Sequence, residues 1–127
     1  MVIELASASW GPQFIVPCIS IKRYYGCVLL RQNLDDDLLR KELNTMEISG
    51  RPAGYVNVWH IRKKGTSSWI RIGESSDRER DFCVRLNTRQ FQNGLYQILG
   101  FLSVTVKSEG DAWIISKQNI ADFDIHN

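Results

Sequence analysis

The sequence predicts a mainly β fold: an antiparallel β-sandwich or barrel of seven to eight short strands with one short amphipathic helix. Three observations carry this prediction. Residues 82–86 alternate apolar and other side chains with the period of a strand. Asn93-Gly94 is a strong turn signal, and a long β-prone run follows it. One segment, residues 35–46, has helical periodicity instead.

Two strands are expected early in the chain. Residues 14–21 form an apolar run, and Pro17 inside it predicts an edge position or a bulge because proline cannot donate a ladder hydrogen bond. Residues 24–30 are rich in side chains that suit a pleated surface. Gly26 at the centre of this second run predicts a kink.

Residues 35–46 predict the helix. Asn33 or Asp35 can cap its N-terminus, and the aspartates at 35–37 complement the helix dipole. Gly50, followed by Pro52, stops further helix. Side chains spaced i, i+4 and i+7 make one apolar stripe, which predicts that the helix packs on the sheet. The stripe consists of Leu39, Leu43 and Met46.

Residues 55–62 and 68–73, separated by a turn at residues 63–66, predict a β-hairpin. We expect a loop of two or four residues, because that register buries four apolar side chains and no arginine. The expected pairs are Trp59 with Ile70 and Asn57 with Ile72.

The expected register divides the hairpin into two faces, and a loop of odd length would instead place Trp59 on the face of Trp69. The core face carries Trp59, Ile61, Ile70 and Ile72. The other face carries His60, Arg62, Trp69 and Arg71 beside Val56 and Val58.

Residues 82–86, 95–107 and 112–116 complete the predicted strands. Gly100 predicts a bend or bulge within the second of these, and the turn at residues 109–111 precedes the third. Alternation predicts the core residues Phe82, Val84, Leu86, Tyr96, Ile98, Leu102, Val104 and Val106.

Residues 55–106 carry a pattern that resembles a known family. The first part reads Trp59…Arg62…Gly65…Trp69…Ile72-Gly73…Ser75. The second part reads Phe82-x-Val84-x-Leu86-Asn87-Thr88, then Asn93-Gly94-x-Tyr96-x-Ile98. This is similar to the immunoglobulin-like and fibronectin-III-like repeats of bacterial surface and secreted proteins. The resemblance implies a binding or spacer module and supplies no catalytic residues.

The chain has 127 residues and a mass of 14.6 kDa, so residues 1–127 are expected to form a single β-rich domain. Sixteen basic and fourteen acidic residues give a net charge of +2, which does not by itself require nucleic acid or a membrane as partner. No run of 18 apolar residues predicts a membrane span, and the N-terminus lacks the basic leader of a signal peptide.

The three cysteines, Cys18, Cys27 and Cys83, are an odd number, so they cannot all pair within one chain. Their apolar neighbours predict small buried thiols in a reducing compartment. The alternative is one disulfide and one free thiol outside the cell. The compartment stays open, but the absence of a leader and of an N-x-[ST] acceptor site favours the cytoplasm.

The sequence predicts no catalytic residue, no metal site and no cofactor. His60 and His126 are far apart, whereas zinc sites use clustered ligands. Residues 35–37 suit a helix start better than a calcium loop. A Cys83–His60 pair would require neighbouring strands, and the acids at residues 74–81 alternate with arginines as in a solvated turn.

Candidate ligand-binding residues gather on the hairpin: Arg62, Lys63, Lys64, Trp69 and Arg71. An aromatic ring beside arginines can stack on a base or sugar, and the charges can hold phosphates. The preferred hypothesis is a non-catalytic interaction module that binds another protein as an accessory or regulatory domain. The alternative is binding to a polyanion, such as nucleic acid or an acidic polysaccharide, or to a carbohydrate. A small hydrolase is the third hypothesis.

Overall fold

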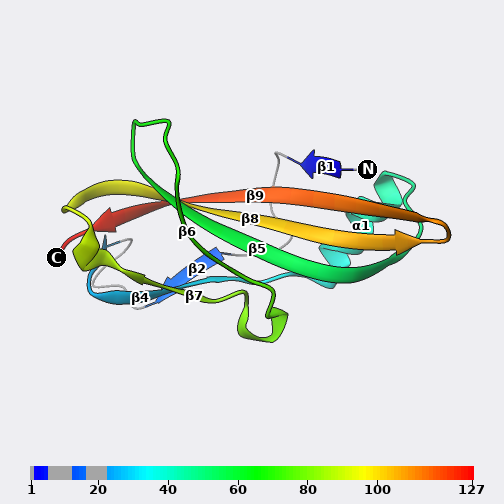
Figure 1. Ribbon diagram of the computed structural model, residues 1–127, viewed down its shortest axis with the longest axis horizontal. Coiled ribbons are helices and arrows are strands. Elements are labelled where there is room, and N and C mark those ends of the chain that lie inside the picture. The colour runs from blue at the N-terminus through cyan, green and yellow to red at the C-terminus, as the bar shows by residue number, and fades with distance from the viewer. Residues whose placement is uncertain (1, 6–12, 17–22) are drawn as a thin grey trace.

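The computed structural model describes residues 2–5, 13–16 and 23–127, and this part of the chain holds nine strands and one α-helix (Figure 1). The strands are β1 (Val2–Leu5), β2 (Gln13–Val16), β3 (Arg23–Tyr24), β4 (Cys27–Gln32), β5 (Arg51–Lys63), β6 (Ile70–Ser75), β7 (Val84–Asn87), β8 (Gly94–Ser108) and β9 (Asp111–Ile125). The helix α1 is Asp36–Thr45, and short 3-10 turns cover Arg78–Arg80 and Thr88–Gln90.

The strands form two sheets. The first has the order β1-β9-β8-β5-β6, with β3 also beside β9, and the second has the order β2-β4-β7. All pairs are antiparallel except β1 and β3, which run parallel to β9. The predicted mainly β fold is therefore confirmed, and the described strands form two open sheets and no closed barrel. They number nine, more than expected, and β5, β8 and β9 are long.

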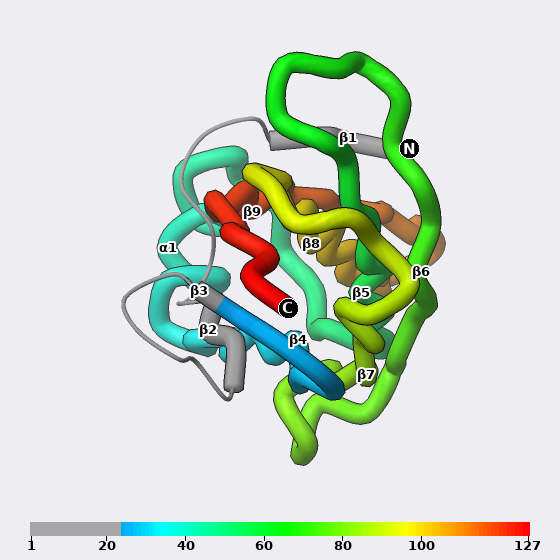
Figure 2. The backbone as a smooth tube through the Cα atoms, turned by 90° about the vertical axis from the view of Figure 1, so that its left-hand side faces the viewer, coloured from blue at the N-terminus to red at the C-terminus, as the bar shows by residue number. Residues whose placement is uncertain are grey.

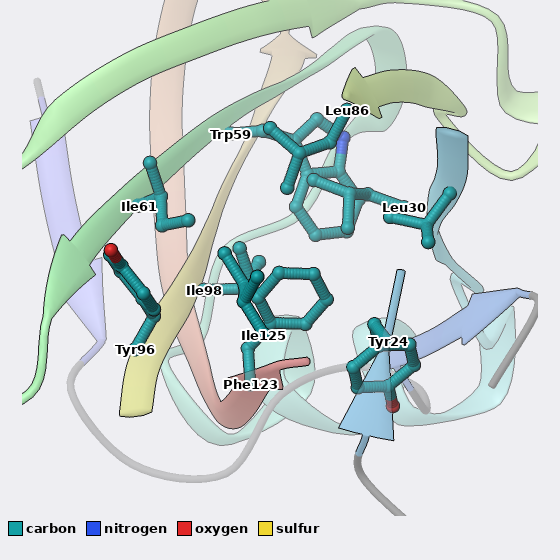
Figure 3. Packing of buried hydrophobic residues seen from close by; sticks show 10 residues of the cluster. Tyr24, Leu30, Trp59, Ile61, Leu86, Tyr96, Ile98, Phe123 and Ile125 are labelled. Carbon is teal, nitrogen blue, oxygen red and sulfur yellow. The ribbon is translucent and has the colours of Figure 1, made fainter. Parts of the chain in front are cut away.

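The long strands β5, β8 and β9 organise the molecule, and Figure 1 shows them running its full length. One end of their inner face packs against α1 and the other end against the second sheet, which gives two hydrophobic clusters. Figure 3 shows the cluster beneath the second sheet, where the Tyr24 and Phe123 rings stack with their centroids 4.5 Å apart. We call the opposite face of the first sheet the outer face.

The helix is where the sequence places it. The Asp35 side chain accepts hydrogen bonds from the backbone N–H of Asp37 at 2.9 Å and of Leu38 at 3.4 Å, which confirms the N-cap. Two of the predicted stripe residues are buried and the third packs against them from a partly buried position, so the helix is docked. The stripe residues are Leu39, Leu43 and Met46.

The helix ends before the glycine that was expected to stop it. Glu47 adopts a φ of +56°, and the backbone N–H of Ile48 donates to the carbonyl oxygen of Leu43 at 2.9 Å, which closes the last turn. Gly50 serves a different purpose. A Cβ at this position would lie 2.7 Å from the carbonyl oxygen of Lys107, so glycine lets the chain pass close to β8.

The predicted core is confirmed with one adjustment, because Val84 is only partly buried against the cluster beneath the second sheet. The fully buried members are Phe82, Leu86, Tyr96, Ile98, Leu102, Val104 and Val106. Gly26 has a φ of +75° between β3 and β4, in agreement with the predicted kink. Pro17, predicted to mark an edge or bulge, lies outside the described residues.

Three strand predictions need correction. The ladder passes through Gly100 without a change of register, so of the bend or bulge expected there the bulge is absent. The last strand does not end at Ser116 but continues to Ile125, because it pairs with β8 along its whole length. β1 was not predicted at all, since its pairing to β9 has no local sequence signal.

The cysteine prediction is wrong for Cys27, which is exposed; Cys83 is partly exposed, and both are free thiols. Alternation explains the exposure, because Val28 and Leu30 of β4 point into the core and Cys27 therefore points out. Cys18 lies outside the described residues. Among the described residues, no helix has the length and apolar character to cross a membrane.

Candidate functional site

The predicted hairpin is formed by β5 and β6, and the connection between them stands clear of both sheets (Figures 1 and 2). Its predicted register is wrong: Trp59 pairs with Gly73 instead of Ile70, and Asn57 pairs with Ser75 instead of Ile72. The connection covers residues 64–69 and is longer than expected.

A β-bulge between Trp59 and His60 shifts the ladder and leaves Ile72 as the extra residue on β6. Ile72 stays partly buried against the core, as predicted. Ile70 was also predicted to be core, but it is 57% exposed because it opens an edge strand.

The two faces of β5 agree with the prediction despite the changed register. Trp59 and Ile61 are fully buried on the inner face, so His60 and Arg62 lie on the outer face. His60 pairs across the ladder with Arg71. Trp69, as expected, is only partly buried.

The guanidinium of Arg62 lies over the ring of Trp69, with 4.2 Å between Cζ and the ring centroid. Its Nε donates a 2.9 Å hydrogen bond to the side-chain oxygen of Gln97 on β8. Trp69 and Gln97 therefore fix the position of Arg62 from two sides. A cation held over a tryptophan ring contributes about 0.5–1 kcal/mol at an exposed site.

The remaining predicted cations have different surroundings. Lys64 pairs with Asp122 of β9 at 3.3 Å, and Arg71 pairs with Glu74 at 3.2 Å. Lys63 pairs across the ladder with the buried Tyr96, so alternation directs it to the inner side, away from Arg62. Of the five predicted residues, Arg62 and Trp69 are in direct contact, Lys64 and Arg71 pair with other residues on the same outer face, and Lys63 lies on the inner side. We call Arg62, Lys64, Trp69 and Arg71, with His60, the Trp69 patch.

His60 is the member of the patch that the sequence did not single out. Burial, and secondly the positive charge of Arg71, lower the pKa of His60 from its ordinary value of 6.5. Its Nδ1 atom is closed off from solvent and has no hydrogen-bond partner among the described residues. A buried polar atom without a partner costs about 1–3 kcal/mol, so a turn of the ring that brought this atom to a ligand would regain part of that cost.

Other residues that the sequence offers for catalysis or metal binding are explained by structural contacts. Three of the four acids at residues 74–81 lie in ion pairs: Glu74 with Arg71 at 3.2 Å, Asp77 with Arg80 at 3.7 Å and Asp81 with Arg31 at 3.2 Å. No three histidine, cysteine or acidic side chains gather into a possible metal site within the described ranges. His60 points to the outer face, whereas Cys83 follows Phe82 on the inner side, so the two do not form a pair.

Two hollows in the described part of the surface lie away from the patch. A cleft of about 290 Å³ between α1 and β5 is lined by Asp36, Asp37, Leu39, Arg40, Leu43, Pro52 and Tyr55. A second, of about 330 Å³, lies at the other end of α1. Arg78 contacts two residues that line the first cleft, because it pairs with Asp36 at 2.8 Å and its Cζ lies 5.2 Å from the centre of the Tyr55 ring.

Comparisons with protein-family models, with characterised proteins and with solved structures find no match to this chain. The similarity of residues 55–106 to immunoglobulin-like and fibronectin-III-like repeats stays a prediction. Sequence reasoning missed Gln97, Asp122 and Glu74 as neighbours of the patch. The hydrophobic pattern could have placed the first two on the outer face, but their contacts depend on the register of β8 and β9.

Proposed function

We propose that this protein is a non-catalytic interaction module that binds another protein through the Trp69 patch. The observation that carries the proposal is the Arg62 guanidinium held 4.2 Å over the ring of the partly exposed Trp69. Tryptophan and arginine are the residues most enriched among those that dominate binding energy in protein interfaces. An arginine already fixed by a ring and an amide loses little side-chain entropy when a partner arrives.

The surroundings of the patch also favour a protein partner. Leu95 and Ile120 are 54% and 45% exposed on the outer face, beside the buried Leu99. The cores of protein interfaces are enriched in aromatic residues and arginine, and this surface combines such residues with exposed aliphatic side chains. The similarity to immunoglobulin-like repeats, which serve as binding or spacer modules, supports the same proposal.

Polyanion or carbohydrate binding is the second candidate, favoured by the basic residues and the aromatic ring of the hairpin. Two observations weigh against it. Lys64 and Arg71 are each paired with a carboxylate of the same chain, which reduces the positive potential of the patch. Arg62 also covers one side of the Trp69 ring, where a base or sugar would stack.

The test begins with affinity capture by the tagged full chain from an extract of its source cells. The Trp69→Ala/Arg71→Ala variant should lose a partner that the wild type retains. The Arg85→Ala/Arg89→Ala variant is the matched control, because it removes two exposed arginines away from the patch and should keep the partner. A protein captured equally by all three would contradict the proposal.

Salt dependence of the purified complex separates the two candidates. A protein interface with one or two rim charges should lose less than about tenfold in affinity between 50 and 200 mM salt, whereas six to ten phosphate contacts cost about 10³–10⁵. A nucleic acid recovered with the wild type, with a steep salt dependence, would replace the protein hypothesis with the polyanion one.

A further inference from the structure

Three nitrogen-bearing side chains lie side by side on the outer face of the hairpin. His60 of β5 pairs with Arg71 of β6, and Arg62 lies two residues further along β5 on the same face. The imidazole holds its Nδ1 out of contact with water and without a partner in the described part of the chain. Two arginine side chains on the same face as an imidazole nitrogen that has no hydrogen-bond partner can bind an anionic group.

Both arginines retain hydrogen-bonding capacity for a ligand. Arg62 uses its Nε for Gln97, and no partner for its terminal nitrogens is found among the described residues. Arg71 pairs with Glu74, but both side chains are 55% exposed, and an ion pair in such a position stabilises a protein only weakly. An incoming carboxylate can therefore take the place of Glu74 at little cost.

The side chains around His60 come from every neighbouring strand, and the charged ones nearest to it come from β5 and β6. β5 contributes Arg62, and β6 contributes Arg71 and Glu74. β8 contributes the uncharged Gln97 and Leu99, while Asp122 of β9 pairs with Lys64. The positions next to the imidazole are thus positively charged, with one exposed and replaceable carboxylate.

We propose that His60, Arg62 and Arg71 bind a side-chain carboxylate of the protein partner, so that the partner presents an acidic segment to the outer face. This inference rests on the proposed function and names the chemistry of its partner. Arginine is suited to the role because its planar guanidinium can hold a carboxylate through two parallel hydrogen bonds.

Binding of a carboxylate should be coupled to proton uptake. In the free protein the lowered pKa of His60 keeps its imidazole neutral at pH 7. A carboxylate next to the imidazole favours the protonated form, so the complex takes up at most one proton from solvent. The affinity should therefore rise as the pH falls from about 7 to about 5.5, where glutamate, with an ordinary pKa of about 4.3, remains ionised.

A short polyglutamate peptide is the probe, and the pKa of His60 in the full chain is followed by NMR. We expect saturable binding, a rise of the His60 pKa in the complex, and an affinity about three- to fivefold higher at pH 5.5 than at pH 7 for a shift of one pKa unit, which would reach about tenfold only over a wider pH range. His60→Gln should keep weaker binding and lose the pH dependence, and Arg62→Ala/Arg71→Ala should bind at least about tenfold less tightly. His126→Gln and Arg85→Ala are matched controls that should behave like wild type.

Two further probes are measured in parallel, inorganic phosphate and an oligothymidylate. If either binds at His60 and polyglutamate does not, the partner class proposed here is wrong. If no probe changes the His60 pKa while a partner still depends on Trp69 and Arg71, the acidic-segment inference is overturned and the proposed function survives. If the captured partner binds equally at both pH values and to the His60→Gln variant, the inference is overturned as well.

Discussion

The indole Nε1 of Trp59 donates a 2.8 Å hydrogen bond to the carbonyl oxygen of Phe82, and both side chains are fully buried. The bond joins the middle of the first sheet to the segment that leads into β7 of the second. Asp81 and Phe82 have φ values of +54° and +53°, a conformation that costs a non-glycine residue about 1–2 kcal/mol. Trp59 therefore helps to hold a turn that its own residues do not favour.

Replacing Trp59 with phenylalanine should lower the free energy of unfolding by about 2–4 kcal/mol. The change removes the donor for the Phe82 carbonyl, which costs about 1–3 kcal/mol, and leaves a cavity. Urea denaturation measures the loss. Trp113→Phe is the control, because Trp113 is only partly buried and should lose less than about 1 kcal/mol. Equal losses in both variants would show that the buried hydrogen bond has no special role.

The docking of α1 is tested at Leu43, which is fully buried against β8 and β9. Leu43→Ala should destabilise the protein by about 2–5 kcal/mol through lost burial and a cavity, and Leu43→Asp by more. Leu38 lies on the same helix but is 41% exposed, so Leu38→Ala should change stability by less than about 0.5 kcal/mol. A Leu43→Asp variant that melts at the wild-type temperature would mean that the helix is not docked.

A second link between α1 and the sheet is the ion pair of Glu42 with Lys117 of β9. The Lys117 side chain is only 4% exposed and that of Glu42 is 28% exposed. Glu42→Gln removes the carboxylate that pairs with the buried Lys117 ammonium and should cost about 1–3 kcal/mol, less than in a fully buried pair because Glu42 retains some contact with water.

Replacing both members of this pair should restore part of the loss. Glu42→Leu/Lys117→Met removes the charges together, and such apolar replacements are often neutral. A double-mutant cycle measured by denaturation gives the coupling free energy. A coupling near zero would contradict a stabilising role for the pair.

The pH dependence of stability reports on His60. Because its folded-state pKa is lowered, the unfolded chain binds a proton at a higher pH than the folded chain does. The free energy of unfolding should therefore fall as the pH drops below about 6.5. His60→Gln should reduce this fall between about pH 7.5 and 5.5, measured by urea midpoints, while His126→Gln should retain it. A steeper fall in the His60 variant would reverse the sign argued here.

Much of the fold could be predicted because the relevant signals are local. Alternation within residues 82–86 and 95–107 placed the core, and the Asp35 cap with the Leu39 and Leu43 stripe placed the helix. The parallel pairing of β1 with β9 has no such signal, because it depends on contacts between the two ends of the chain. The second half of β9 was not predicted either. Lys117 and Asn119 are polar residues at inward positions, so they interrupt the apolar pattern that indicates a strand.

In the candidate site, too, features with a local sequence signal could be predicted and features set by strand pairing could not. Alternation along β5 correctly placed Arg62 on the outer face and Trp59 on the inner one. The register of β6 could not be predicted from alternation, because a bulge interrupts it. Ile72 is the extra residue of the bulge and still packs against the core, while the pairing of the rest of β6 is shifted. Lys63 was assigned to the patch from its sequence neighbours, yet alternation sends it to the opposite side.

The dissociation constant of the captured partner, compared between the wild type and the Trp69→Ala/Arg71→Ala variant, tests the Trp69 patch as a protein-binding surface most directly. Melting temperatures are measured on the same samples. We predict an affinity loss of at least about tenfold, as expected for central tryptophan and arginine residues, with a stability change of about 1 kcal/mol or less. Unchanged affinity, or a large loss of stability that accounts for the lost binding, would contradict the proposal.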